Sequence, residues 1–182
     1  MGASLGGTQA VQQLLSTLSL PFALPIVLVL HRHRDSDHGL VGVLQRGSAL
    51  RVVEAMDKQP LDAATVYVAP PDYHVLIDGD HLALSVDEPV HYARPSIDVL
   101  FESAAVPGRC AIGVVLTGGG ADGARGAAAI EASGGLVLVQ RPSEALSADM
   151  PAAAIAATRH AEVHDLDSMA RRLLELAKDE WH

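Results

Sequence analysis

The segment Leu116–Ala124, with the sequence LTGGGADGA, decides the fold. It joins an apolar run, residues 111–116, to residues 122–133, whose apolar spacing predicts a helix. A buried strand that passes through a glycine-rich turn into a helix is typical of α/β proteins with a parallel sheet. A second apolar run, residues 25–30, ends directly at His31. We therefore expect both turns at the carboxyl edge of one sheet.

Strand-like and helix-like segments alternate along the whole chain. The predicted fold is α/β: a doubly wound, mostly parallel sheet with helices on both faces and one antiparallel hairpin. The turn sequence Asp78-Gly79-Asp80 marks the hairpin, between strands 74–78 and 81–86. The other expected strands are 25–30, 51–54, 65–69, 111–116, 135–140 and 161–164, and the expected helices are 10–18, 39–46, 95–105 (Pro95 in its first turn), 122–133, 151–158 and a last one capped by Asp167 that ends near residue 178.

Composition limits the classes of function. The chain has 182 residues, enough for one domain over residues 1–182, and its core must be aliphatic because 49% of residues are hydrophobic and only 3% aromatic. A net charge of −9 without a basic cluster argues against nucleic acid as a partner. The apolar runs are too short for direct membrane insertion, and no signal peptide is visible, so we expect a cytoplasmic protein. Cys110, the only cysteine, starts a predicted strand, so we expect a buried, inert thiol.

Three polar residues stand where a strand gives way to a loop: Ser4, His31 and Asp122. They are the parts of an activated nucleophile. Ser4 lies in the glycine-rich turn GASLGG, residues 2–7, whose small side chains leave backbone N–H groups to face a developing oxyanion. His31 would take the proton of Ser4, and Asp122 would orient the imidazole. The order Ser, His, Asp differs from that of the α/β-hydrolase fold.

Each candidate also has a structural interpretation. The turn around Ser4 could hold an anion at a helix N-terminus, and Asp122 could simply cap the helix that follows it. His31 has two rivals nearby, His33 and His38. The spacing of these three histidines defines no ligand set, so we expect no metal and no cofactor.

Several motifs along the chain carry a family resemblance: GASLGG at 2–7, His31, VYVAP at 66–70 with His74, RPSIDVLF at 94–101, LTGGGADG at 116–123 and Met150-Pro151. On these motifs the chain resembles the catalytic domain of CheB-type protein-glutamate methylesterases, from Gly2 to about Leu174 and without the receiver domain. The resemblance implies a serine esterase that removes methyl groups from glutamyl methyl esters, releases methanol, and in many members also deamidates glutamines. It implies methylated chemoreceptor signalling helices as partners.

The resemblance also indicates residues around the catalytic trio. Leu5 and Gly119 are expected at the oxyanion site. Arg94, Ser96 and His74 are expected to line the substrate cleft, although a structural role for each is equally open. Asp98 falls among apolar residues and is expected to be structural.

Four positions depart from the family pattern. Only Met1 precedes Gly2, so the first strand is expected to be missing or clipped. Leu5 stands where the family commonly has threonine or a small residue, and Gly119 replaces its usual methionine. Ala93 replaces a frequent histidine, with His91 two residues earlier. These departures motivate the alternative of a degenerate, non-catalytic homologue that acts as a signalling interaction module. A third alternative is an α/β module that binds a small anion at its glycine turn.

Overall fold

The computed structural model describes residues 1–31 and 39–178, and these residues contain the sheet that the sequence predicts. Its strands are all parallel, in the order β3-β4-β2-β1-β7-β8-β9. The hairpin is also confirmed, as a separate antiparallel pair, with Asp78 opposite His81. The strands are β1 (Gly2–Ala3), β2 (Ile26–Leu30), β3 (Arg51–Glu54), β4 (Thr65–Val68), β5 (His74–Asp78), β6 (His81–Ser85), β7 (Ile112–Val115), β8 (Leu136–Gln140) and β9 (Glu162–His164).

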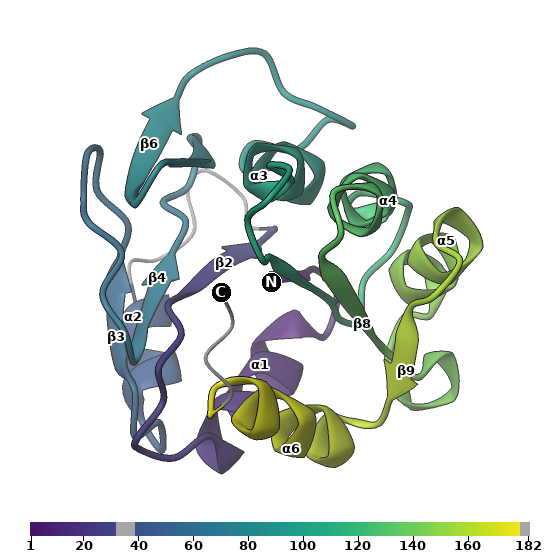
Figure 1. Cartoon of the computed structure of the whole chain (residues 1–182), viewed down its shortest axis with the longest axis horizontal. Helices are drawn as coiled ribbons and strands as arrows, with labels where there is room; N and C mark the ends of the chain where they lie inside the picture. The colour runs from purple at the N-terminus through teal and green to yellow at the C-terminus, as the bar shows by residue number, and fades with distance from the viewer. Residues whose placement is uncertain (32–38, 179–182) are drawn as a thin grey trace.

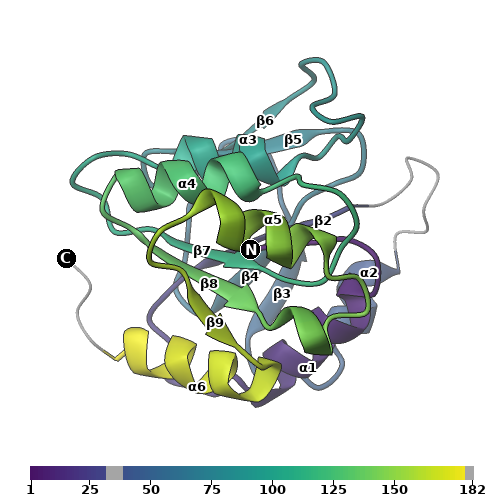
Figure 2. The ribbon, with the colours of Figure 1, turned by 90° about the vertical axis from the view of Figure 1, so that its right-hand side faces the viewer.

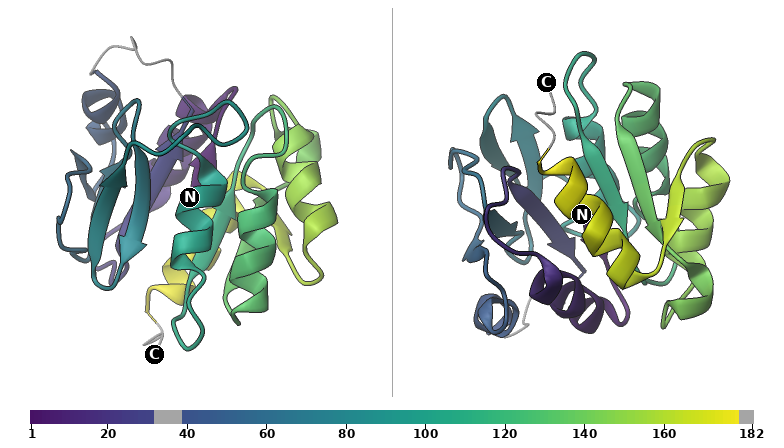
Figure 3. Two further views of the ribbon diagram at one scale, coloured as in Figure 1. Left: turned by 90° about the horizontal axis from the view of Figure 1, so that it is seen from above. Right: turned by 60° about the horizontal axis from the view of Figure 1, so that its bottom comes forward.

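Helices cover both faces of the sheet (Figures 1 and 2). One face carries α1 (Gly7–Thr17), α2 (Leu40–Gln45) and α6 (Leu166–Leu176). The other carries α3 (Ile97–Ala104), α4 (Ala124–Ala132) and α5 (Asp149–Ala157), which lie side by side next to the hairpin (Figure 3, left). A short 3-10 turn, Pro142–Glu144, precedes α5.

The strands read as continuous aliphatic runs because they are buried on both faces. In β2, Leu28 and Leu30 pack into the core on the α1 and α6 side, whereas Val29 between them packs into the core under α3 to α5. Alternate residues point to opposite faces, so each strand supplies both cores.

Strand β1 occupies the centre of the sheet although it has only two residues. Gly2 pairs with Val29 on one side and with Val115 on the other, and Ala3 pairs with Leu30. From β1 the sheet extends through β2, β4 and β3 on one side, and through β7, β8 and β9, which come later in the chain, on the other side. The junction of β1 and β7 is therefore the topological switch point, where ligands bind in doubly wound sheets.

Three local predictions are wrong. The N-cap of α6 is Asp165, not Asp167, because the Asp165 carboxylate accepts the Ser168 N–H at 2.7 Å. Pro95 precedes α3 rather than opening it, since Ser96 is the cap. Cys110 is exposed, because β7 begins only at Ile112 and the cysteine lies in the loop before it.

Within residues 1–31 and 39–178, no helix combines the length and the apolar character that crossing a bilayer requires.

Candidate active site

The register of the central strands brings Ser4 and His31 together. Ala3 pairs with Leu30, so the residues that follow them, Ser4 and His31, are next to each other at the carboxyl edge. The His31 N–H donates to the Ala3 carbonyl at 3.1 Å, and the Ser4 N–H donates to the Thr117 carbonyl at 2.9 Å. Ser4 is thus held between the end of β2 and the end of β7. Neighbouring strands lie about 4.8 Å apart, within reach of a serine–histidine contact.

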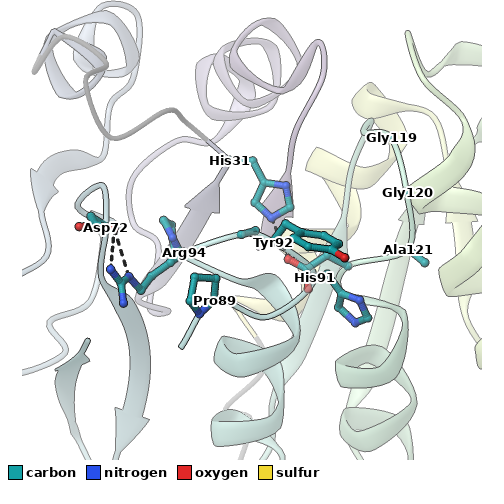
Figure 4. A pocket seen from close by; sticks show the side chains of 12 residues that line it. His31, Asp72, Pro89, His91, Tyr92, Arg94, Gly119, Gly120 and Ala121 are labelled. Atoms are coloured by element: carbon teal, nitrogen blue, oxygen red, sulfur yellow. Dashed lines mark hydrogen bonds and ion pairs between the residues drawn. The ribbon is translucent and has the colours of Figure 1, made fainter. Parts of the chain in front are cut away.

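His31 and Asp122 form a direct pair. The distance from His31 Nε2 to Asp122 Oδ2 is 2.7 Å (Figure 4). The Asp122 side chain is only 4% exposed, whereas that of His31 is 20% exposed. A carboxylate at this distance holds the ring proton on Nε2, which leaves the lone pair of Nδ1 to act as a base.

Asp122 is held by more than the imidazole. Its Oδ1 accepts the Ser96 hydroxyl and the Asp98 N–H, both at 2.9 Å, and its Oδ2 accepts the Ile97 N–H at 2.8 Å. Burial by itself raises the pKa of Asp122, but the hydrogen bonds from His31, the two backbone N–H groups and Ser96 outweigh burial and lower that pKa below its ordinary value. Asp122 is therefore an ionised partner for the histidine.

The alternative role of Asp122, capping its own helix, is not what the structure shows. The N-cap of α4 is Gly123, at φ 96°, a left-handed conformation that glycine adopts without strain. The donors on the Asp122 carboxylate come instead from the start of α3.

Ser4 is half-buried, and among the described residues no hydrogen bond joins its hydroxyl to His31. Gly118 packs directly against it. A Cβ at position 118 would lie 2.8 Å from Ser4 Cβ and would overlap Met150 Sδ. Only glycine fits between the nucleophile turn and α5.

A cleft of about 730 Å³ opens beside His31 and Asp122. One wall is formed by Gly119, Gly120 and Ala121, and the opposite wall by the loop from Pro89 to Pro95 (Figure 4). At the tip of that loop, His91 and Tyr92 have positive φ values of 50° and 62°, and Tyr92 is fully exposed.

Arg94 lines this cleft, as expected for a cleft residue. Its guanidinium is engaged within the protein: it donates to Asp72 Oδ1 at 2.8 Å and to the carbonyls of Val86 and Asp87 at 2.8 and 3.0 Å. Arg94 therefore also fixes the loop that forms the wall.

Ser96 and His74 do not line the cleft, contrary to expectation, because both are buried behind it. The Ser96 N–H donates to His74 Nδ1 at 3.2 Å, and His74 Nε2 lies 3.2 Å from the Glu88 carbonyl. This arrangement fixes His74 with its proton on Nε2. The two residues support Asp122 from behind.

Of the two residues expected at the oxyanion site, Gly119 lines the cleft, whereas Leu5 is not among its lining residues. Leu5 is 61% exposed. Within the described ranges, the backbone N–H groups of Leu5 and Gly119 donate to no protein acceptor.

Two of the histidines weighed as metal ligands, His33 and His38, lie outside the described residues. Among the residues that are described, no three His, Cys, Asp or Glu side chains gather as a metal site would need.

Three residues that matter here escaped sequence reasoning. Gly118 lay inside a quoted motif, but only the fold shows what packs against it. Asp72, the partner of Arg94, carried no signal. Asp98 was expected to be structural, yet its N–H holds Asp122.

A doubly wound sheet with a serine turn, a histidine and a buried aspartate at its switch point defines a hydrolase outside the α/β-hydrolase fold. Residues 1–173 match the CheB methylesterase family, and the chain belongs to that family.

Individual relatives agree. The chain is 42% identical over 178 residues to a Leptospira interrogans protein assigned as a protein-glutamate methylesterase/protein-glutamine glutaminase, covering 97% of this chain and 92% of the relative. It is 38% identical to a Dechloromonas aromatica protein-glutamate methylesterase/protein-glutamine glutaminase, of which it spans 51%. The crystal structure of the Thermotoga maritima CheB methylesterase catalytic domain, 28% identical, superimposes with a TM-score of 0.90 over 96% of this chain and 95% of that one.

Proposed function

We propose that this chain hydrolyses glutamyl methyl esters on chemoreceptor signalling helices, with Ser4 as nucleophile, His31 as general base and Asp122 as its orienting carboxylate. The observation that carries the proposal is the 2.7 Å contact between His31 Nε2 and Asp122 Oδ2, with Ser4 next to His31 in the strand register. The relatives' names, protein-glutamate methylesterase/protein-glutamine glutaminase, support a protein glutamyl methyl ester as the substrate.

In the proposed reaction, Ser4 Oγ attacks the ester carbonyl carbon while its proton passes to His31 Nδ1. The backbone N–H groups of Leu5 and Gly119 stabilise the negative charge that develops on the carbonyl oxygen. The bond to the methoxy oxygen then breaks, that oxygen takes the proton from His31, and methanol leaves. Asp122 stays ionised throughout and stabilises the imidazolium.

A water molecule then attacks the Ser4 acyl ester. His31 takes one proton from the water and gives it to Ser4 Oγ as the bond between Oγ and the acyl carbon breaks. The serine is restored, and the glutamic acid product loses its remaining acidic proton to solvent as glutamate. The same steps on a glutamine side chain would release ammonia in place of methanol. The hydroxyl–imidazole contact needed for the first step forms when substrate fills the cleft, as is common for catalytic hydrogen bonds.

The test is methanol release from receptor membranes carrying glutamyl methyl esters. Wild type should release methanol and Ser4→Ala should release almost none, with an unchanged melting temperature, because Ser4 serves chemistry rather than packing. Binding of receptor helices without any methanol release would favour the non-catalytic interaction module. A melting temperature that rises with phosphate, without methanol release, would favour the anion-binding alternative.

A further inference from the structure

We propose that Asp98 is a positioning residue for the reaction: it fixes the turn that carries Asp122 by capping α4 while Asp122 caps α3. This inference rests on the proposed function for its kinetic readout, but its geometry stands independently of that function.

Each of the two aspartates accepts hydrogen bonds from the N-terminus of the other's helix. Asp122 immediately precedes the N-cap of α4, yet its carboxylate accepts the N–H groups of Ile97 and Asp98 at the start of α3. Asp98 belongs to the first turn of α3, yet its Oδ1 accepts the N–H of Gly123, the N-cap of α4, at 2.9 Å and the N–H of Gly126, in the first turn of α4, at 2.8 Å. Each carboxylate satisfies backbone donors that would otherwise be left unpaired at the end of the other helix.

The exchange locks the position of the catalytic carboxylate. The backbone N–H of Asp98 donates directly to the Asp122 carboxylate. The Asp98 carboxylate also acts indirectly, because it accepts the N–H of Gly123, the residue that follows Asp122. The two helices can come this close because position 126 has no side chain: a Cβ there would lie 3.1 Å from the Asp98 carbonyl oxygen. A shift of Asp98 would therefore move the turn that presents Asp122 to His31.

The role of Asp98 goes beyond capping α4, because its second carboxylate oxygen, Oδ2, faces other groups. Oδ2 is buried and has no hydrogen-bond partner among the described residues. The charged or titratable groups that face it are His91 Nε2 at 3.4 Å, Arg125 Nε at 4.0 Å and the Asp122 carboxylate. His91 lines the cleft, so Asp98 links the catalytic turn to the loop that forms the opposite wall.

The experiment compares Asp98→Ala and Asp98→Asn with a matched control, Asp165→Ala, which removes the cap of α6 far from the cleft. Asp98→Ala should lower kcat by about 10²-fold, the cost of roughly 1 Å of misplacement, with little change in KM. Asp98→Asn keeps the Oδ1 acceptor and should restore kcat to within about threefold of wild type. Asp165→Ala should lose stability but keep its kcat.

A spectroscopic readout separates this inference from the proposed function. The Nε2 proton of His31, hydrogen-bonded to Asp122, should give a low-field proton resonance, which can be recorded without turnover. The resonance should be lost or broadened in Asp98→Ala and retained in Asp98→Asn and Asp165→Ala. A wild type with the resonance but without methanol release would refute the esterase proposal and leave the positioning role standing.

Two results would overturn the inference: normal kcat and a normal resonance in Asp98→Ala, or an equal fall of kcat in Asp165→Ala. If Asp98→Ala does not fold, Asp98→Glu replaces it, because glutamate keeps the charge but displaces the acceptor by one methylene. Asp98→Glu should then have a lower kcat than Asp98→Asn, and equal values would contradict the positioning role.

Discussion

Two turns of this molecule each carry one buried aspartate, and the surroundings shift the pKa values of the two carboxyl groups in opposite directions. The α4 turn, residues 118–123, presents Asp122, and the α3 turn, residues 94–98, presents Asp98. Both oxygens of Asp122 accept hydrogen bonds, and its pKa is lowered although burial opposes this. Among the described residues, hydrogen bonds reach only Oδ1 of Asp98. Burial raises the pKa of Asp98, and the nearby charge of Asp122 adds to this.

The difference shows how one pair of helix ends can serve both catalysis and structure. The lowered pKa of Asp122 favours its ionised form, which the imidazole needs as a partner. Asp98, by contrast, has a raised pKa, because it is buried and lies beside the charge of Asp122.

The largest effect is expected for Asp122→Asn. The amide cannot hold the ring proton of His31 on Nε2 and stabilise an imidazolium, so turnover should fall by about 10⁴-fold. Methanol release at substrate saturation measures this. Residual turnover within about tenfold of wild type would show that the two aspartates do not differ in the way that we describe.

A smaller but still large effect is expected for Gly118→Ala, which crowds the α4 turn from the other side. The added Cβ would overlap Met150 and push against Ser4, and a misplacement near 1 Å would lower kcat about 10²-fold. Gly42→Ala is the matched control, because a Cβ there meets nothing within 4 Å. Equal kcat values for the two variants would mean that α5 yields to the new methyl group and that Ser4 does not depend on it.

The smallest expected effect is on the pH dependence of stability, where the two aspartates should act in opposite directions. Asp122 has a lowered pKa, so its stabilising contribution is present above the unfolded-state pKa and is lost as pH falls through the folded-state value. Asp98 has a raised pKa, so it binds more protons when folded, and its ionisation reduces stability as pH rises.

At neutral pH, Asp122→Asn should therefore lower the melting temperature and Asp98→Asn should raise it by a few degrees. Both differences should shrink as pH falls below the ordinary aspartate pKa of 3.8. Thermal unfolding of wild type and both variants between acid and neutral pH checks this. A change of the same sign in the two variants would show that the carboxylates share one environment.

The sequence was sufficient for the doubly wound sheet, because aliphatic runs and helical spacing are local signals. It was also sufficient to pair His31 with Asp122, because both follow strand ends and such ends meet at one edge. It failed where long-range contact decides. The sequence left a cleft-lining and a structural role equally open for Ser96 and His74, and both residues are buried in contact with each other.

The crossed caps could not have been predicted for the same reason. An aspartate before or inside a first turn is expected to cap its own helix, and local spacing carries no information that two neighbouring helices will exchange caps. Asp165, which does cap its own helix, shows the ordinary local case, although even there the sequence suggested Asp167 two residues later.

In the proposed reaction, Ser4 is activated by a histidine that Asp122 holds in place. The most direct test is the rate at which a fluorophosphonate labels the protein, followed by mass spectrometry of the labelled peptide. We predict one adduct, on Ser4, that forms rapidly in wild type and about 10³–10⁴ times more slowly in Asp122→Asn. An adduct on another residue, or equal rates in the two proteins, would contradict the account.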